Sequence, residues 1–380
     1  MNTRAFSANS AGEFSAKLKD QLSSGFKPSL AIVFSSVSLG VSELCRVMGE
    51  KDFDFIGCSS CGEILSGHSG SPVIEGSSVT LLWDLDRAAF SVKLFPGDGK
   101  SPFEVGCDIG GWGRDSFADP SFVVLGSGLK MDGEQMIRGL LSVSGPDAKV
   151  YGGLAGDDGR FQETLAFTKD GMTSFGAVAL LLDNSRVEVK GIAPSGWVGL
   201  GARKTITRAE GNVVYTIDHE SALAVYKCYL DVRDEELPGI GVEYPMLVLR
   251  DDGTEVLRAI MGVEPDTGAL IFAGSVPEKS KVRFSSSPGF EVLDFVKSEL
   301  KQFHERFSEA SLLLLFSCMA RHGALGPMVE DEINEASRLW KAPLVGFFTY
   351  GEIGENAHGK CDFYNETFAL MALRMRDSSR

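Results

Sequence analysis

The sequence contains little of what membrane-spanning and nucleic-acid-binding proteins require. No stretch approaches the roughly 18 consecutive apolar residues that cross a bilayer as a helix, and the best apolar run, residues 175–182, has the length of a strand. Basic residues are also few, because 37 Lys and Arg stand against 52 Asp and Glu and give a formal net charge of −15. Nucleic acids and anionic membranes are bound through clustered basic side chains, so the sequence argues against both as partners.

The sequence also has neither the cysteine pattern of a disulfide-linked protein nor a secretion signal. The seven cysteines are an odd number scattered from Cys45 to Cys361, which is unsuited to a disulfide framework and typical of a reducing compartment. The first ten residues are polar and lack the apolar segment of a secretory signal. We therefore expect a cytoplasmic protein.

The remaining composition is that of an ordinary globular protein. A chain of 380 residues with 43% hydrophobic side chains can bury a large core and suggests two or three domains. Phe14, Leu18 and Leu22 recur at four-residue spacing, which predicts an N-terminal helix within residues 1–27. We expect the rest of the chain to form one domain over residues 28–215 and another over residues 216–376.

An internal repeat is the most specific signal in the sequence. A strand ending in Phe34-Ser35 is followed by a helix, a second strand and Gly57-Cys-Ser-Ser-Cys-Gly-Glu-Ile64. The same order returns with Phe316-Ser317 and Gly346-Phe-Phe-Thr-Tyr-Gly-Glu-Ile353, and a looser third copy contains Gly152-Gly-Leu-Ala-Gly-Asp-Asp158. The order predicts an α/β protein of two related halves, made of layered strand–helix–strand units with mixed sheets and a ligand cleft between the domains.

The repeated turns combine glycines with a carboxylate, and two interpretations stay open. Glycine permits positive φ or lets another group approach the backbone closely. The acid either accepts hydrogen bonds within the turn or presents its charge to a shared cleft, a common place for small-ligand sites. On the second interpretation, and including residues of the motifs described below, the predicted ligand-binding residues are Gly57, Gly62, Glu63, Gly152, Gly153, Asp157, Arg321, Gly351, Glu352 and Asn365.

These turns, together with Phe272-Ala-Gly-Ser-Val-Pro277, Leu315-Phe-Ser-Cys-Met-Ala-Arg321 and Asn365-Glu-Thr367, resemble the FIST family over about residues 28 to 375. The resemblance implies an intracellular signal-transduction sensor with N-terminal and C-terminal FIST domains, a small-molecule ligand, no enzymatic activity and a signalling protein as partner. Some bacterial members that consist of these two domains bind haem and sense nitric oxide through a histidine kinase. The chain resembles those stand-alone members, which makes haem the expected cofactor.

Haem would need an axial His, Cys or Tyr in an apolar pocket. His322 lies just beyond a strand that we expect to be buried, at the end where open α/β sheets hold ligands, so it is the leading candidate for metal ligation. Arg321 could clamp a carboxylate or propionate through two parallel hydrogen bonds, or pair on the surface. A structural role stays open for every histidine, and the remaining ones are His68, His219 at the start of a predicted helix, His304 and His358.

Other chemistry has weaker support. Cys58-x-x-Cys61 lies in a turn, without the helix N-terminus of a redox pair or the second ligand pair of a zinc site, so we expect structural cysteines and leave redox and metal roles open. Alternatives to the haem sensor are an amino-acid or metabolite sensor without haem, an enzyme that uses Glu63 and Glu352 for acid–base chemistry, and a scaffold without ligand. The ligand, the partner and the formation of a homo-oligomer also stay open.

Overall fold

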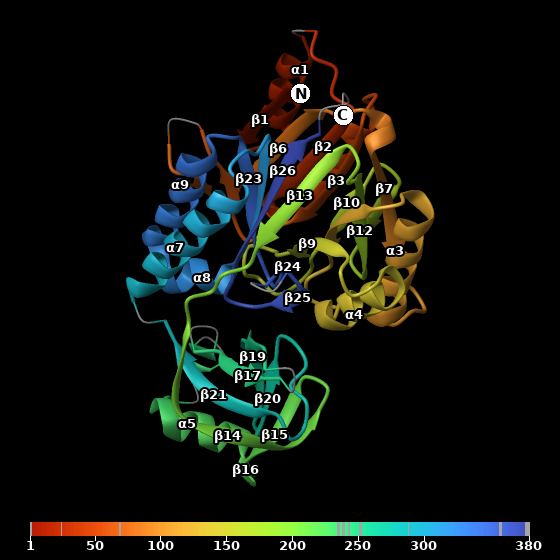
Figure 1. Ribbon diagram of the computed structural model, residues 1–380. Coiled ribbons are helices and arrows are strands. Elements are labelled where there is room, and N and C mark those ends of the chain that lie inside the picture. The colour runs from red at the N-terminus through yellow and green to blue at the C-terminus, as the bar shows by residue number, and fades with distance from the viewer. Residues whose placement is uncertain are drawn as a thin grey trace.

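The computed structural model describes residues 2–23, 25–67, 70–233, 236–237, 240–241, 244–250, 253–287, 289–356 and 359–376. Figure 1 shows two parts: a large body of sheets with helices on its outside, and a smaller, mainly β part below it. We call the smaller part, residues 198–286, the inserted domain, and the remainder the three-repeat body. None of the described helices is long and apolar enough to cross a membrane.

The three-repeat body is built from one unit that occurs three times. The first repeat contains β1 (Asn2–Ala8), α1 (Ala11–Ser23), β2 (Leu30–Ser35), the 3₁₀ turn η1 (Val37–Leu39), α2 (Val41–Gly49), β3 (Asp54–Ser59), the hairpin β4 (Glu63–Leu65) and β5 (Val73–Ile74), and β6 (Ser78–Asp84). After η2 (Arg87–Ala89), the second contains β7 (Phe90–Pro96), α3 (Pro102–Ser116), β8 (Pro120–Gly126), α4 (Gly133–Ser144), β9 (Lys149–Leu154), β10 (Ala166–Thr168), β11 (Gly171–Thr173) and β12 (Gly176–Asp183).

The third repeat is interrupted by the inserted domain. It contains β13 (Val187–Ile192), then, after the insertion, α7 (Glu291–Arg306), β22 (Leu312–Cys318), α8 (Met319–Leu325), η4 (Gly326–Met328), α9 (Val329–Trp340), β23 (Leu344–Thr349), β24 (Glu352–Glu355), β25 (Cys361–Tyr364) and β26 (Phe368–Met375). The expected α/β class with mixed sheets is confirmed. The looser copy of the sequence analysis, which contains Gly152 to Asp158, is the second repeat and has the full set of strands and helices.

Each repeat gives its hairpin to the sheet of another repeat. The strand orders are β1-β6-β2-β3-β10-β11, β7-β12-β8-β9-β24-β25 and β13-β26-β22-β23-β4-β5, so the same four-strand pattern ends each time in a borrowed hairpin. The central pairs β2·β3, β8·β9 and β22·β23 are parallel, and the other pairs are antiparallel. The first repeat gives its hairpin to the sheet of the third, the second to that of the first, and the third to that of the second. Every sheet is therefore linked to both others, and the three form one body. The predicted boundary between residues 215 and 216 lies inside β15 (Val213–Ile217) of the inserted domain.

The sheets share one core and carry helices on their outer faces. Inner-face side chains of all three sheets meet in a common cluster, in which the ring of Phe34 stacks on Phe347 at 4.5 Å and meets Phe316 edge-on at 6.4 Å. The outer faces pack against α1 and α2, against α3 and α4, and against α7 to α9. The strands are therefore buried on both faces, which explains their nearly continuous apolar sequences.

The first glycine of each repeated turn allows two strands to approach closely. Gly57, Gly152 and Gly346 occupy the same place on the second strand of each parallel pair. A Cβ atom there would lie 2.4, 1.9 and 2.1 Å from the carbonyl oxygens of Val33, Val124 and Leu315. Any side chain would collide with the neighbouring strand, so these glycines serve the packing of the sheets.

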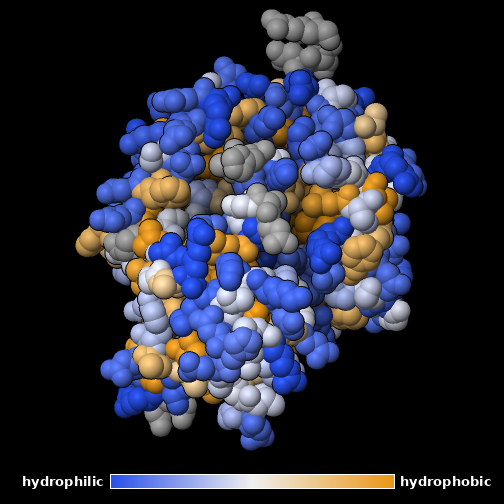
Figure 2. Space-filling view, turned by 60° about the horizontal axis from the view of Figure 1, so that its bottom comes forward, coloured by the Kyte–Doolittle hydropathy of each residue, from blue (hydrophilic) through white to orange (hydrophobic). Residues whose placement is uncertain are grey.

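The inserted domain is a curled sheet with a core of its own. It contains β14 (Val198–Glu210), β15 (Val213–Ile217), β16 (Glu220–Ser221), α5 (Ala222–Leu230), β17 (Met246–Leu249), β18 (Glu255–Arg258), β19 (Ile260–Glu264), β20 (Ala269–Phe272) and β21 (Lys281–Ser286). The strand order starts at β18 and ends at β19, which are neighbours in the chain, so the sheet curves back on itself around the apolar cluster. Figure 2 shows the end of the molecule that carries this domain, where separate hydrophobic patches interrupt a mainly hydrophilic surface.

Candidate functional site

The repeated carboxylate Glu63 is used inside the fold. Its side chain is fully buried at the start of β4. The Ser60 hydroxyl donates a hydrogen bond to Oε1, and the backbone N–H and hydroxyl of Ser77 donate to Oε2 at 3.1 and 2.6 Å. Burial raises the pKa of Glu63 to about 7, although these hydrogen bonds lower it. The carboxyl thus ties the turn to the strand that follows the hairpin.

Glu352 repeats this arrangement in the third repeat. It too is fully buried, and it accepts hydrogen bonds from the Thr349 hydroxyl and from the N–H and hydroxyl of Thr367, at 3.1 and 3.0 Å. Burial again raises the pKa to about 7. Neither Glu352 nor Glu63 lines the pocket described below, so the structure does not place them as a facing acid–base pair there.

Asp157 organises a loop of the second repeat. The carboxylate is 1% exposed and accepts hydrogen bonds from the backbone N–H groups of Phe161, Gln162 and Glu163, at 3.0, 2.6 and 3.0 Å. The Tyr350 hydroxyl donates to the same carboxylate from the third repeat. Asp157 therefore joins two of the repeated turns.

The other predicted glycines are packed against neighbouring groups. Gly62 has φ 117°, and a Cβ there would meet the ring of Phe348 at 3.2 Å. At Gly351 a Cβ would lie 2.3 Å from the ring of Phe363, and at Gly153 it would lie 2.9 Å from the Gly351 carbonyl oxygen. These positions need glycine for packing, whatever else they do.

Arg321 lies behind the wall of a pocket and holds that wall in place. Its fully buried guanidinium forms two hydrogen bonds to the fully buried Glu332. It also donates to the backbone oxygens of Ser195 at 2.6 Å and Glu366 at 3.3 Å, and lies over the ring of Trp197 at 5.2 Å. Because the guanidinium is engaged on all sides, it positions the pocket wall through the Ser195–Trp197 segment.

His322 stacks on Phe348 with the ring centroids 4.3 Å apart, and its Nε2 lies 4.0 Å from a carboxylate oxygen of Glu75. Burial lowers its pKa. His304 meets Trp340 edge-on, and His219 lies in a turn, where Ser221 rather than His219 caps α5. His68 and His358 lie outside the described residues. In the described part of the chain, no group of three or more His, Cys, Asp or Glu could hold a metal ion.

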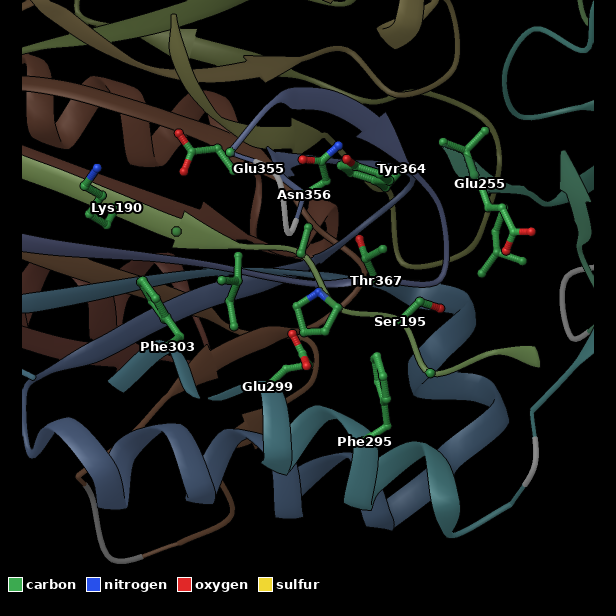
Figure 3. A pocket seen from close by; sticks show the side chains of 18 of the residues that line it. Lys190, Ser195, Glu255, Phe295, Glu299, Phe303, Glu355, Asn356, Tyr364 and Thr367 are labelled. Atoms are coloured by element: carbon green, nitrogen blue, oxygen red, sulfur yellow. The ribbon is translucent and has the colours of Figure 1, made fainter. Parts of the chain in front are cut away.

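A pocket of about 550 Å³ lies between the three-repeat body and the inserted domain, and we call it the inter-domain pocket. Figure 3 shows Phe295, Glu299 and Phe303 reaching into it from α7, with Glu355, Asn356 and Tyr364 on the opposite side. Its wall consists of residues 188 and 190–197 on and after β13; Phe295, Glu299, Phe303, Arg306 and Phe307; Leu247 and residues 255–257 of the inserted domain; and Glu355, Asn356, Gly359, Tyr364, Asn365, Thr367 and Arg374. Of the predicted ligand-binding residues, the pocket contains Asn365.

Charges of both signs line this pocket. Lys190 is exposed and forms no ion pair with any described residue, whereas Arg374 pairs with Glu188 at 2.6 Å. Burial raises the pKa of Glu355, against the opposing influence of Tyr151 and Lys190. The pocket thus offers both an ammonium and a carboxyl group near apolar surface from α7.

Most of this wall carries no motif that would mark it in the sequence. One local signal was present in Val187-Glu-Val-Lys-Gly-Ile192, where Val187 and Val189 alternate with Glu188 and Lys190. Alternation of this kind indicates a strand with one buried face and one accessible face. Phe295 gave no such signal, because its 47% exposure on α7 is visible only in the structure.

The residues of this pocket do not fit a haem ligand set. Its described lining contains no His or Cys, and Tyr364 is the side chain of a type that ligates haem iron. Burial raises the pKa of Tyr364 well above its ordinary value, so the phenol stays protonated at neutral pH. The described lining therefore offers no ionised axial ligand to a haem iron at neutral pH.

An ion-pair network holds the inserted domain against the body beside this pocket. Glu134 of α4 accepts hydrogen bonds from Arg258 at 2.9 Å, from the Ser275 amide at 3.0 Å and from Arg250 at 3.2 Å. Arg250 also pairs with Asp362 of β25. We call these residues the domain clamp, because they join the two walls of the pocket.

Comparison with protein-family models matches residues 29–220 to the FIST N domain and residues 222–355 to the FIST C domain. A search of curated proteins gives no match.

Proposed function

The chain belongs to the FIST family, and we propose that it senses a small polar ligand of the amino-acid class in the inter-domain pocket. FIST domains are sensor domains of signal transduction that bind small ligands and generally are not enzymes. The proposal rests on the observation that the pocket is lined by both parts of the molecule. The three-repeat body contributes Lys190 and Glu355 on one side, and the inserted domain contributes Glu255 on the other. A ligand there touches both parts at once.

The ligand class follows from the charges and the apolar surface. Lys190 and Arg306 are cationic groups for a carboxylate, and Glu255, Glu299 and Glu355 are acidic groups for an ammonium. Phe295, Phe303 and Trp197 supply apolar surface for a side chain. Pockets of 300–1,000 Å³ with a few placed polar groups are typical of small-molecule sites.

Binding becomes a signal only if the ligand prefers one arrangement of the two parts. A ligand that contacts Lys190 on β13 and Glu255 on β18 loses one set of contacts when the inserted domain moves away, so it favours the closed arrangement. A signalling protein, for which a histidine kinase is one candidate, would then respond to the position of the inserted domain. This partner is part of the proposal and rests on the family.

The binding experiment uses the full chain and the twenty amino acids as probes in a thermal-shift screen. We expect at least one to raise the melting temperature, because a ligand at 100 times its Kd stabilises the native state by about 2.7 kcal/mol. Lys190→Gln should weaken its binding at least tenfold, whereas Lys19→Gln, an exposed lysine on α1, should leave binding unchanged. Absence of any shift, or equal binding by Lys190→Gln, would overturn the amino-acid proposal.

Haem and nitric oxide are tested separately by absorption. In the described lining of the inter-domain pocket, Tyr364 is the side chain of a type that ligates haem iron, and its raised pKa keeps the hydroxyl protonated. Protein isolated from haem-replete cells should show no Soret band if the amino-acid proposal is right. A stoichiometric Soret band that shifts with nitric oxide would replace that proposal by a haem sensor.

A further inference from the structure

A strained, exposed aromatic residue, Phe161, lies outside the lining of the inter-domain pocket. Phe161 adopts φ 53°, in the left-handed region that bulky side chains avoid. Its side chain is nevertheless 48% exposed, so burial of the ring does not compensate for this conformation. Strain of this kind persists where surrounding interactions impose it, and it occurs preferentially at binding sites.

The interactions that impose this conformation are those of Asp157. Its carboxylate binds the backbone N–H groups of Phe161, Gln162 and Glu163, at 3.0, 2.6 and 3.0 Å, and the Tyr350 hydroxyl. This buried carboxylate therefore sets the direction in which the chain leaves the loop at Phe161.

The result is a fixed pair of aromatic rings. Phe161 stacks on Tyr350 with the ring centroids 5.0 Å apart and the planes 8° from parallel. Gly128 belongs to the same arrangement, since a Cβ there would lie 2.8 Å from the Tyr350 ring and 1.8 Å from the Ala155 carbonyl oxygen. Because one face of Phe161 lies on Tyr350, its exposed area is available to a third ring.

Phe161 and Tyr350 line a cavity of about 420 Å³, which we call the Phe161 cavity. One wall follows the carboxyl end of β8, from Gly128 to Asp132, the position where open α/β sheets bind ligands. The other wall is the inserted domain, with Met261, Ile271 and Phe272. An apolar cavity of 150 Å³ already holds benzene, so this volume accommodates fused rings.

The charges at this cavity favour an anion. Asp132 is already engaged, because it caps α4 by accepting a hydrogen bond from the Gln135 amide at 3.0 Å. Lys130 also lines the cavity; it is exposed and forms no ion pair within the described part of the chain. An anionic group at the mouth would therefore meet an ammonium without a competing partner.

We propose that the Phe161 cavity is a second ligand site, which binds a flat aromatic carboxylate whose ring stacks on Phe161 and whose acid group pairs with Lys130. The site is separate from the inter-domain pocket, since the two share no lining residue. Both cavities have one wall on the inserted domain, so occupancy of either one can influence its position.

The test uses 2-naphthoate as the probe and isothermal titration calorimetry of the full chain. The wild type should bind one equivalent, and Phe161→Ala should weaken binding at least tenfold. The matched control is Phe295→Ala, because Phe295 is 47% exposed and lines the inter-domain pocket instead; this variant should bind 2-naphthoate like the wild type. Lys130→Gln should weaken 2-naphthoate several-fold while leaving the uncharged 2-naphthamide unaffected.

The outcomes separate the second site from the first. No binding by the wild type at millimolar 2-naphthoate, or equal affinity in Phe161→Ala, overturns the proposal. Loss of binding in Phe295→Ala but not in Phe161→Ala also overturns it, because the probe then occupies the inter-domain pocket. Melting curves of Phe161→Ala and Phe295→Ala should match the wild type closely, since each variant replaces an exposed ring. Phe161→Gly is a second variant, which removes the ring and also relieves the strain at positive φ. The amino-acid screen with Lys190→Gln is unaffected by any of these results.

Discussion

Glu63 and Glu352 occupy the same position in two repeats and accept the same set of hydrogen bonds. Each accepts a hydrogen bond from the hydroxyl of the residue three positions earlier, Ser60 or Thr349. Each also accepts two hydrogen bonds, from the backbone N–H and the hydroxyl of a single residue after the hairpin, Ser77 or Thr367. The repeated acid is therefore explained by the need to fix a hairpin that leaves its own sheet and joins another.

This pair makes the stability of the fold depend on pH. The folded pKa of each carboxyl is raised from 4.5 to about 7, so the folded state holds protons that the unfolded state has released. Their contribution is complete below about pH 4.5 and is lost as the pH rises to 7. The loss is on the order of 3 kcal/mol for each carboxyl. Urea unfolding of the wild type should show this decline between pH 5 and 7.5.

A double variant isolates the contribution. The double variant Glu63→Gln with Glu352→Gln mimics the protonated acids. In a protonated carboxyl, as in an amide, one atom donates a hydrogen bond, here to the Ser60 or Thr349 hydroxyl, and the other oxygen accepts from Ser77 or Thr367. The decline between pH 5 and 7.5 should disappear in this variant, and it should persist in Glu305→Gln, an exposed carboxyl on α7. A pH profile of the double variant parallel to that of the wild type would show that the two acids stay ionised in the folded state.

Gly346→Ala should destabilise the fold severely. Its Cβ would lie 2.1 Å from the Leu315 carbonyl oxygen, which is backbone of a central strand and cannot move aside. Overpacking in a core costs about 1–3 kcal/mol and more where backbone is displaced. Gly12→Ala in the first turn of α1 is the control: nothing lies within 4 Å of the added Cβ, so the change should not lower the melting temperature. Thermal unfolding measures both, and equal melting temperatures would contradict the close approach.

The repeat was predictable because its signal is local. Strand–helix–strand order, Phe-Ser strand ends and Gly-Glu turns are all visible in short windows of sequence, and α1 (Ala11–Ser23) follows the predicted spacing. The exchange of hairpins was not predictable, since β4 and β5 contain three and two residues and their partner lies in the third repeat. Pairing between distant segments leaves no period in the sequence. β1 was missed because of its polar composition.

The site was less predictable than the fold for a related reason. Motif residues such as Glu63, Asp157 and Arg321 are fully or almost fully buried and bind other parts of the chain. The inter-domain pocket is instead lined by scattered residues of β13, α7 and β18, which the fold alone brings together. Asn365 belongs to one of the motifs and also lies in that wall, where its side chain accepts a hydrogen bond from the Ala259 amide at 3.4 Å.

The cysteines of the Cys58-x-x-Cys61 turn should be unreactive. Burial raises the pKa of the Cys61 thiol to about 11 and that of Cys58 well above its ordinary value. At pH 8 the thiolate fraction of Cys61 is then about one in a thousand. Mass spectrometry after brief alkylation should find Cys228, which is exposed, labelled far ahead of both. Denatured protein, in which all cysteines react, is the control; labelling of Cys61 as fast as Cys228 would instead indicate an accessible redox pair.

Glu134→Gln should release the inserted domain from the three-repeat body. Arg258 is completely buried and would lose the carboxylate that neutralises it, although its hydrogen bond to the Phe363 carbonyl oxygen at 3.2 Å remains. Removing one member of a buried ion pair costs about 3–5 kcal/mol. Because the loss falls on the contact between the two parts, hydrogen exchange should quicken in β18 and β20 while β22 and β26 keep their protection.

The matched control is Glu43→Gln on α2, which breaks an ion pair with Arg46 whose side chains are 48% and 60% exposed. Exposed pairs contribute about 0–1 kcal/mol, so exchange should match the wild type throughout. In Glu134→Gln the inter-domain pocket would also lose its fixed second wall, and any amino acid that stabilises the wild type should bind more weakly. Unchanged exchange in β18 would mean that the curled sheet is held by its apolar contacts alone, and that the clamp does not set the distance between the two walls.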